Sequence, residues 1–142
     1  MQIVDANVLL YAVNERSEQH DVAKAWLEHA RSGSETVGFS WMVLLAFVRL
    51  TTHPALFPDP LSIGDAATIV RAWPAQPTAV VVEATARHID VLEDSSLGPG
   101  NGRQPRERRA PGSDGTRARA DIVSFDVDFS RFEGIRWLTP GA

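Results

Sequence analysis

The chain has 142 residues and a net charge of −4, with 44% hydrophobic and 23% charged residues, as expected for one globular domain with a sizeable core. It contains no cysteine, which excludes disulfides and thiolate zinc sites. Lys24 is its only lysine and does not follow a glycine-rich turn, so a P-loop is excluded. We find no signal-peptide pattern, and the apolar run at 41–50 is too short to span a bilayer. We therefore expect a single domain over residues 1–142, cytoplasmic and without membrane association.

Hydrophobic periodicity and turn residues predict alternating strands and helices. The expected elements, in chain order, are a strand at 3–4, helices at 6–13 and 17–32, a strand at 36–39, helices at 41–52 and 62–73, a strand at 79–82, a helix at 84–94 and a strand at 121–125. Ser40 is predicted to cap one of these helices, and Ser62 with Asp65 forms a capping box for another. This order predicts a three-layer α/β domain with a mainly parallel sheet.

The predicted helix at 17–32 carries a set of residues at helical spacing, namely Val22, Ala25, Trp26 and His29. The four tryptophans, at positions 26, 41, 73 and 137, are spread along the chain and are interpreted as core residues rather than as a platform for stacking nucleic-acid bases.

Two predicted strands, near opposite ends of the chain, each run into an acidic residue, Asp5 and Asp126. In an open parallel sheet, ligands bind outside the carboxyl ends of the strands, so the two carboxylates can converge there. Crowded carboxylates favour a hard cation such as Mg²⁺ between them. Taken singly, Asp5 could instead cap the following helix, and Asp126 and Asp128 could order a tight turn.

Residues 98–119 differ in composition from the rest of the chain. These 22 residues contain six of the 14 basic residues and half of the glycines, and their only apolar side chains are two alanines. Composition alone indicates a flexible basic loop, or an arginine-rich arm that contacts RNA. A parallel final strand, however, needs a crossover helix before it, and the sequence contains no pattern for one.

Three segments carry a resemblance to a known family: M-x-I-V-D-A-N-V-L-L-Y-A-V-N, F-S-W-M-V-L-L-A-F-V-R-L-T-T and D-I-V-S-F-D-V-D-F-S-R-F-E-G-I-R-W. Nearly end to end, the chain resembles the PIN-domain ribonuclease toxins of the VapC family. The resemblance implies a type II toxin–antitoxin endoribonuclease that hydrolyses RNA phosphodiester bonds with Mg²⁺, or with Mn²⁺ in its place. It also implies a VapB-like antitoxin partner and a homodimer.

The same resemblance assigns roles to four positions. Asp5 and Asp126 match the catalytic metal-binding aspartates, and Asp128 matches an acidic position that orients the site by hydrogen bonds. Asn7 could orient a ligand or the attacking water. One departure concerns the helix at 41–52, where many PIN domains carry a glutamate and this chain has Ala46.

The second departure is the stretch 98–119 itself. The family has a helix there that resembles G-N-L-V-N-D-A-H-L-A-A-L-A-L-E-H and supplies a further metal-binding aspartate. Codons compatible with residues 103–118, read one nucleotide later, encode G-N-L-V-N-D-A-H-L-A-A-(M or T)-A-L-E-H. We infer two compensating frameshifts, one near 95–98 and one near Arg119; the alternative is a divergent loop.

Three functions follow as hypotheses. The first is an active endoribonuclease toxin, and the second is a catalytically impaired PIN-domain remnant that only binds antitoxin or RNA. The third is a protein that binds nucleic acid through phosphate contacts of the arginine-rich arm, with steep salt dependence and no response to EDTA.

Overall fold

The computed structural model describes residues 1–83, 120–132 and 135–142. Its centre is a five-stranded sheet in the order β3-β2-β1-β4-β5, and every adjacent pair of strands is parallel. The strands are β1 (Gln2–Val4), β2 (Val37–Ser40), β3 (Ala79–Val82), β4 (Asp121–Val123) and β5 (Trp137–Leu138). The predicted α/β architecture with a mainly parallel, PIN-like sheet is thus confirmed.

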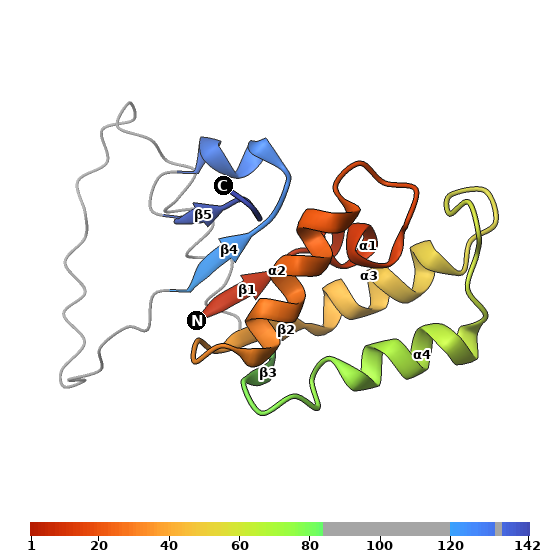
Figure 1. The fold of residues 1–142 in the computed structure, drawn as a ribbon, viewed down its shortest axis with the longest axis horizontal. Coiled ribbons are helices and arrows are strands. Elements are labelled where there is room, and N and C mark those ends of the chain that lie inside the picture. Colours follow the sequence, from red (N-terminus) through yellow and green to blue (C-terminus); the bar gives the residue numbers. More distant parts are fainter. Residues whose placement is uncertain (84–119, 133–134) are drawn as a thin grey trace, which may run out of the picture.

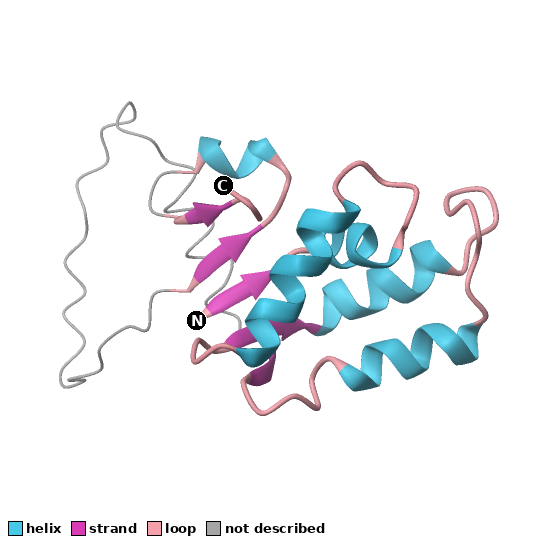
Figure 2. Cartoon of the chain, in the orientation of Figure 1, coloured by secondary structure: helices cyan, strands magenta, loops and turns pink. Residues whose placement is uncertain are grey.

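Among the described residues, four helices lie on one side of the sheet and, in sequence, connect β1 to β2 and β2 to β3 (Figures 1 and 2). They are α1 (Ala6–Val13), α2 (His20–Ser32), α3 (Trp41–Thr51) and α4 (Ile63–Ala72). A short 3-10 helix, η1 (Val127–Arg131), follows β4. The first and third helices begin directly after β1 and β2, so their amino termini lie at the carboxyl edge of the sheet.

Side-chain caps explain where several of these helices begin. The Ser40 hydroxyl accepts a hydrogen bond from the amide of Met42 at 3.2 Å, and the Ser62 hydroxyl accepts one from the amide of Asp65 at 3.0 Å. Both serines satisfy amide donors that the first helical turn leaves free. The predicted caps of α3 and α4 are therefore confirmed.

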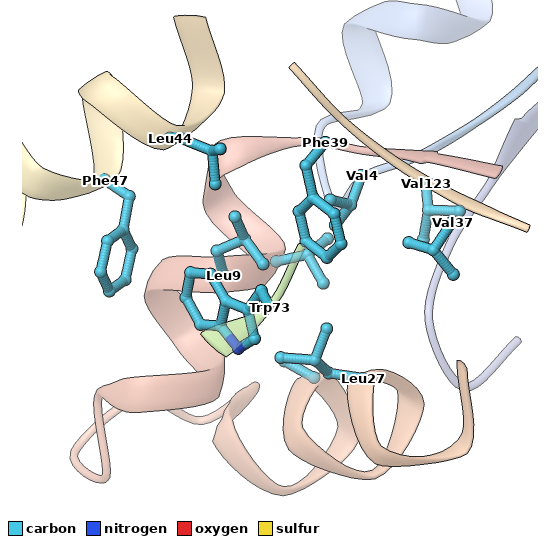
Figure 3. Packing of buried hydrophobic residues seen from close by; sticks show 11 residues of the cluster. Val4, Leu9, Leu27, Val37, Phe39, Leu44, Phe47, Trp73 and Val123 are labelled. Atoms are coloured by element: carbon cyan, nitrogen blue, oxygen red, sulfur yellow. The ribbon is translucent and has the colours of Figure 1, made fainter. Parts of the chain in front are cut away.

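The core lies between the sheet and the helices (Figure 3). Trp73, at the end of α4, stacks on Phe39 of β2 with ring centroids 6.3 Å apart. Phe47 of α3 meets the same indole edge-on at 4.8 Å. Such aromatic pairs add about 0.5–1.5 kcal/mol beyond the area they bury, so this cluster fixes α3 and α4 against β2.

Two predictions about side-chain burial were wrong. The buried residues of α2 are Ala23 and Leu27, whereas Val22 of the helically spaced set is exposed, because α2 presents a neighbouring face to the core. Trp41 is 52% exposed and is therefore not a core residue. Its helix turns Leu44 and Phe47 inward instead, so that Trp41 faces outward.

Some predicted elements differ from those in the structure, and others lie outside the described residues. β5 and η1 were not among the expected elements, and α2 begins at His20 rather than at residue 17. The helix expected at 84–94 and the aberrant stretch at 98–119 lie outside the described residues. In the part of the chain that the structure describes, no helix is long and apolar enough to cross a membrane.

Candidate functional site at the carboxyl edge of the sheet

Strand register brings the two ends of the chain together. β1 and β4 pair in parallel with Val4 beside Val123, so the next residue of each strand, Asp5 and Ser124, also lie side by side. The Asp5 amide donates to the carbonyl oxygen of Val123 at 2.9 Å, which extends the ladder to the sheet edge. The first acidic residue is thus fixed by backbone pairing as well as by its side chain.

Ser124 is the centre of a hydrogen-bond cluster. Its side chain is fully buried, and its hydroxyl donates to Oδ2 of Asp5 at 2.7 Å. The same hydroxyl oxygen accepts from Nδ2 of Asn7 at 2.9 Å and from the amide of Asp126 at 2.9 Å. A buried polar group with this many partners holds its neighbours in one arrangement.

Asn7 closes the cluster from the first turn of α1. Its Nδ2 lies 3.1 Å from Oδ2 of Asp5, and its Oδ1 accepts from the amide of Phe125 at 3.2 Å. The amide group therefore bridges β1, α1 and the residues after β4. That Asn7 orients a ligand or the attacking water stays a prediction.

Asp126 and Asp128 are further from the cluster and are exposed. Asp126 joins it through its backbone amide, whereas its carboxylate Oδ1 accepts from the amide of Asp128 at 2.9 Å. No described hydrogen bond joins the Asp128 side chain to Asp5 or Asp126. The structure thus brings Asp5, Asn7 and Ser124 into direct contact, adds Asp126 through Ser124, and places Asp128 at the rim.

The capping roles considered for these acids are also present. Asp5 is the N-cap of α1, with its Oδ1 accepting from the amide of Ala6 at 2.7 Å. Asp126 is the N-cap of η1. A carboxylate has about four acceptor positions. Asp5 accepts from Ala6, Asn7 and Ser124 and keeps about one position free, and Asp126 uses one in its cap, so capping and cation binding are compatible.

Among the described residues, no cationic side chain pairs with these carboxylates. Among the described residues, the ion pairs within 4 Å join Met1 to Glu35, Arg16 to Asp59 and Arg136 to Asp121, and none of them includes Asp5, Asp126 or Asp128. Asp121 belongs to the opposite, amino end of β4. Carboxylates beside a partly buried polar cluster suit a hard divalent cation.

The donor set nevertheless falls short in number. Across residues 1–83, 120–132 and 135–142, no three histidine, cysteine, aspartate or glutamate side chains are grouped closely enough to hold a metal ion. α3 contributes Ala46 where the resemblance expects glutamate. The described residues of the site therefore fit Mg²⁺ by donor type, without a third carboxylate grouped with Asp5 and Asp126.

Two residues of the site were missed by sequence reasoning. Ser124 could have been found, because a serine two residues before an aspartate commonly bonds the backbone amide of that aspartate. Trp137 carries no local signal: its Nε1 donates to the carbonyl oxygen of Ser124 at 2.8 Å from β5, and only the tertiary fold brings them together.

Comparison with known proteins places this geometry in a family. The family model described as "PIN domain" matches residues 3–97. Ribonuclease VapC37 of Mycobacterium tuberculosis (strain ATCC 25618 / H37Rv) is 49% identical over 142 residues, which cover 100% of this chain and 99% of the relative. Ribonuclease VapC33 of the same strain is 33% identical over 142 residues, covering 99% and 98%. Matches of this extent, together with the PIN-like sheet, show that the chain belongs to the VapC family of PIN-domain proteins.

Proposed function

We propose that the chain is the toxin of a type II toxin–antitoxin pair, a Mg²⁺-dependent endoribonuclease in its in-frame form. Mn²⁺ is the alternative cation. The observation that carries the proposal is the Ser124-centred cluster, which orients Asp5 and joins it to Asp126 at the edge where parallel sheets bind ligands. The names of the relatives, all ribonucleases, support the same reaction class.

The chain's own residues supply orientation and negative charge. Asp5 and Asp126 would hold the cation, while Ser124 and Asn7 keep the Asp5 carboxylate in one rotamer through bonds of 2.7 and 3.1 Å. Asp128, at the rim, would orient the site by hydrogen bonds. When bound, Mg²⁺ supplies positive charge at the scissile phosphate and makes water more acidic.

The frameshift hypothesis receives support from the extent of the matches. The PIN-domain match stops at residue 97, just before the aberrant stretch at 98–119 begins. The alignment with VapC37 nevertheless spans the full length of both proteins, so there is no room for a long inserted loop. A segment exchanged for another of equal length is what two compensating frameshifts produce.

The proposed frameshift lowers the number of metal ligands in this chain as written. It removes the aspartate of the expected helix, and Ala46 already leaves α3 without a carboxylate at the family position. Mg²⁺ demands near-ideal octahedral geometry, so one missing ligand weakens both its affinity and its placement. The second candidate function, an impaired remnant that binds only antitoxin or RNA, is favoured by this shortage of ligands.

The proposed partners are a VapB-like antitoxin, the RNA substrate and a second copy of the chain. Resequencing the gene decides whether the shift lies in the gene or only in its recorded sequence. The functional test uses a frame-restored chain and its Asp5→Ala variant on RNA. We expect cleavage that EDTA removes, that Mg²⁺ restores and that Asp5→Ala abolishes; cleavage that persists in EDTA would contradict a metal-dependent ribonuclease.

A further inference from the structure

An aromatic pair lies beside the candidate site, apart from the aromatic cluster around Trp73. The ring of Tyr11, in α1, meets the ring of Phe125 edge-on, with ring centroids 5.3 Å apart and an angle of 64° between the ring planes. Phe125 directly follows Ser124 and directly precedes Asp126. Tyr11 therefore packs on the residue that connects the buried hydroxyl to the second predicted cation ligand.

Helix α1 holds Phe125 at two points. Asn7 and Tyr11 are four residues apart, so their side chains lie on one face of α1, about one turn from each other. The side-chain oxygen of Asn7 accepts a hydrogen bond from the amide of Phe125 at 3.2 Å, and Tyr11 packs on the ring of the same residue. A residue held at both its backbone and its side chain has little freedom to rotate. The two contacts thus fix the direction in which the chain continues to Asp126.

Tyr11 is itself held by α2. Because α1 ends at Val13, the carbonyl oxygen of Tyr11 has no amide four residues later within the helix. Nδ1 of His20, the first residue of α2, lies 2.9 Å from that oxygen. A carbonyl oxygen only accepts, so the imidazole donates this bond. It keeps the last turn of α1 in place beneath the contact with Phe125.

The ring of Tyr11, rather than its hydroxyl, makes this contact. Both Tyr11 and Phe125 are half-buried and pack against the hydrophobic core. Within the described part of the chain, the hydrogen bond of Tyr11 to another side chain is the one that its backbone oxygen accepts from His20. Phenylalanine is therefore the conservative replacement for Tyr11, and leucine is the replacement that removes the aromatic ring but keeps an apolar side chain.

We propose that Tyr11 is a positioning residue of the candidate site: its ring holds Phe125 and thereby sets where Asp126 lies relative to Asp5. The inference rests on the proposed function, because it concerns the residues that would hold the cation. It goes beyond that function by giving a role to a side chain that is neither a carboxylate nor a member of the Ser124-centred cluster.

Amide hydrogen exchange tests the contact in the chain as written, without a cation. Protection of an amide reports the local or global opening that exposes it. The Val37 amide, which donates to the carbonyl oxygen of Thr78 at 2.9 Å, serves as a reference in the sheet. We expect Tyr11→Leu to speed exchange of the Phe125 amide roughly tenfold more than exchange of the Val37 amide, and Tyr11→Phe to keep the wild-type ratio. An unchanged ratio in Tyr11→Leu would overturn the proposal.

Phe47→Leu is the matched control, because it removes another edge-on aromatic pair. Phe47 meets Trp73 at 4.8 Å and 71° and is fully buried in the core. We expect Phe47→Leu to lower the urea midpoint at least as much as Tyr11→Leu and to speed exchange of the Phe125 and Val37 amides equally. If Phe47→Leu raised the ratio as much as Tyr11→Leu, any loss of core packing would explain the effect, and the specific role of Tyr11 would be refuted.

Mn²⁺ binding to the frame-restored chain, followed by water-proton relaxation, connects the contact to the proposed function. We expect Tyr11→Leu to weaken Mn²⁺ affinity about tenfold, at the lower end of the effect of groups that orient metal ligands, and Tyr11→Phe and Phe47→Leu to retain it. Unaltered affinity in Tyr11→Leu would overturn the positioning role alone. If the unsubstituted restored chain bound no Mn²⁺, the proposed function would be overturned together with the role of Tyr11 in it.

Discussion

The candidate site has two parts that differ in how complete they are. Where β1 meets β4, Asp5, Asn7 and the buried Ser124 form a partly buried hydrogen-bonded cluster. On the other side, α3 offers Ala46, and residues 98–119 contain arginine, glycine and proline where the family resemblance requires a helix with an aspartate. The orientation of Asp5 and the total negative charge of the site are therefore encoded by different segments of the sequence. Strand register and hydrogen bonds position Asp5, and the remaining carboxylates must come from other segments.

The largest expected effect is the rise in thermal stability that Mg²⁺ causes. A ligand at 100 times its Kd stabilises the folded state by about 2.7 kcal/mol, which is roughly 10 °C in Tm for a domain of this size. We expect such a shift in the frame-restored chain and little shift in the chain as written, measured by thermal melting with and without Mg²⁺. Asp5→Ala in the restored chain should remove the shift, and a shift that survives would mean that Mg²⁺ binds elsewhere.

Ser124→Ala should weaken the hydrogen-bonded cluster around Asp5 and Asn7, both in the chain as written and in the frame-restored chain. The substitution leaves the Asp5 carboxylate, the Asn7 amide and the Asp126 amide without their common partner. Loss of a buried hydrogen-bonding partner costs about 1–3 kcal/mol, measurable by urea unfolding. In the restored chain, the Mg²⁺ affinity should also fall by about 10–100-fold, as for other groups that orient metal ligands.

Ser130→Ala is the control for Ser124→Ala. Ser130 is exposed, and its hydroxyl donates to the carbonyl oxygen of Val127 at 2.7 Å, outside the cluster. Its removal should change stability by less than about 0.5 kcal/mol and leave Mg²⁺ affinity unaltered. Equal losses for both serines would show that the cluster has no special role.

Ser62→Ala should lower the stability of the scaffold and leave the candidate site unchanged. The hydroxyl of Ser62 caps α4 through the Asp65 amide, away from the candidate site. An N-cap substitution of this kind costs about 1 kcal/mol, again by urea unfolding. The Mg²⁺ response of the restored chain should not change, and a weakened response would show that α4 is coupled to the site.

Much of the fold was predictable because it depends on local signals. Helix α1 and strand β3 have the predicted bounds, and Ser40 and Ser62 cap the predicted helices. β5 was not predictable, since a two-residue strand exists only through its pairing with β4. The exposure of Trp41 was missed for a related reason: composition indicates that an aromatic residue prefers burial, and only the packed fold shows that Leu44 and Phe47 occupy the inner face.

The candidate site was predictable in its residues and less so in its connections. Asp5 directly follows β1 as the sequence indicated, whereas Asn7 lies in the first turn of α1 and Asp126 comes three residues after the end of β4. The hydroxyl of Ser124 that joins them depends on the register of β1 against β4, which pairs residues more than 100 positions apart. Whether Asp5 and Asp126 bind Mg²⁺ stays a prediction.

The most direct test of the proposed metal-dependent activity is to measure RNA cleavage by both forms of the chain in one assay. The chain as written and the frame-restored chain are compared on the same RNA with Mg²⁺ and with EDTA. We expect EDTA-sensitive cleavage by the restored chain and weak or no cleavage by the chain as written, because Asp5 and Asp126 alone leave the cation short of ligands. Robust Mg²⁺-dependent cleavage by the chain as written would contradict this expectation.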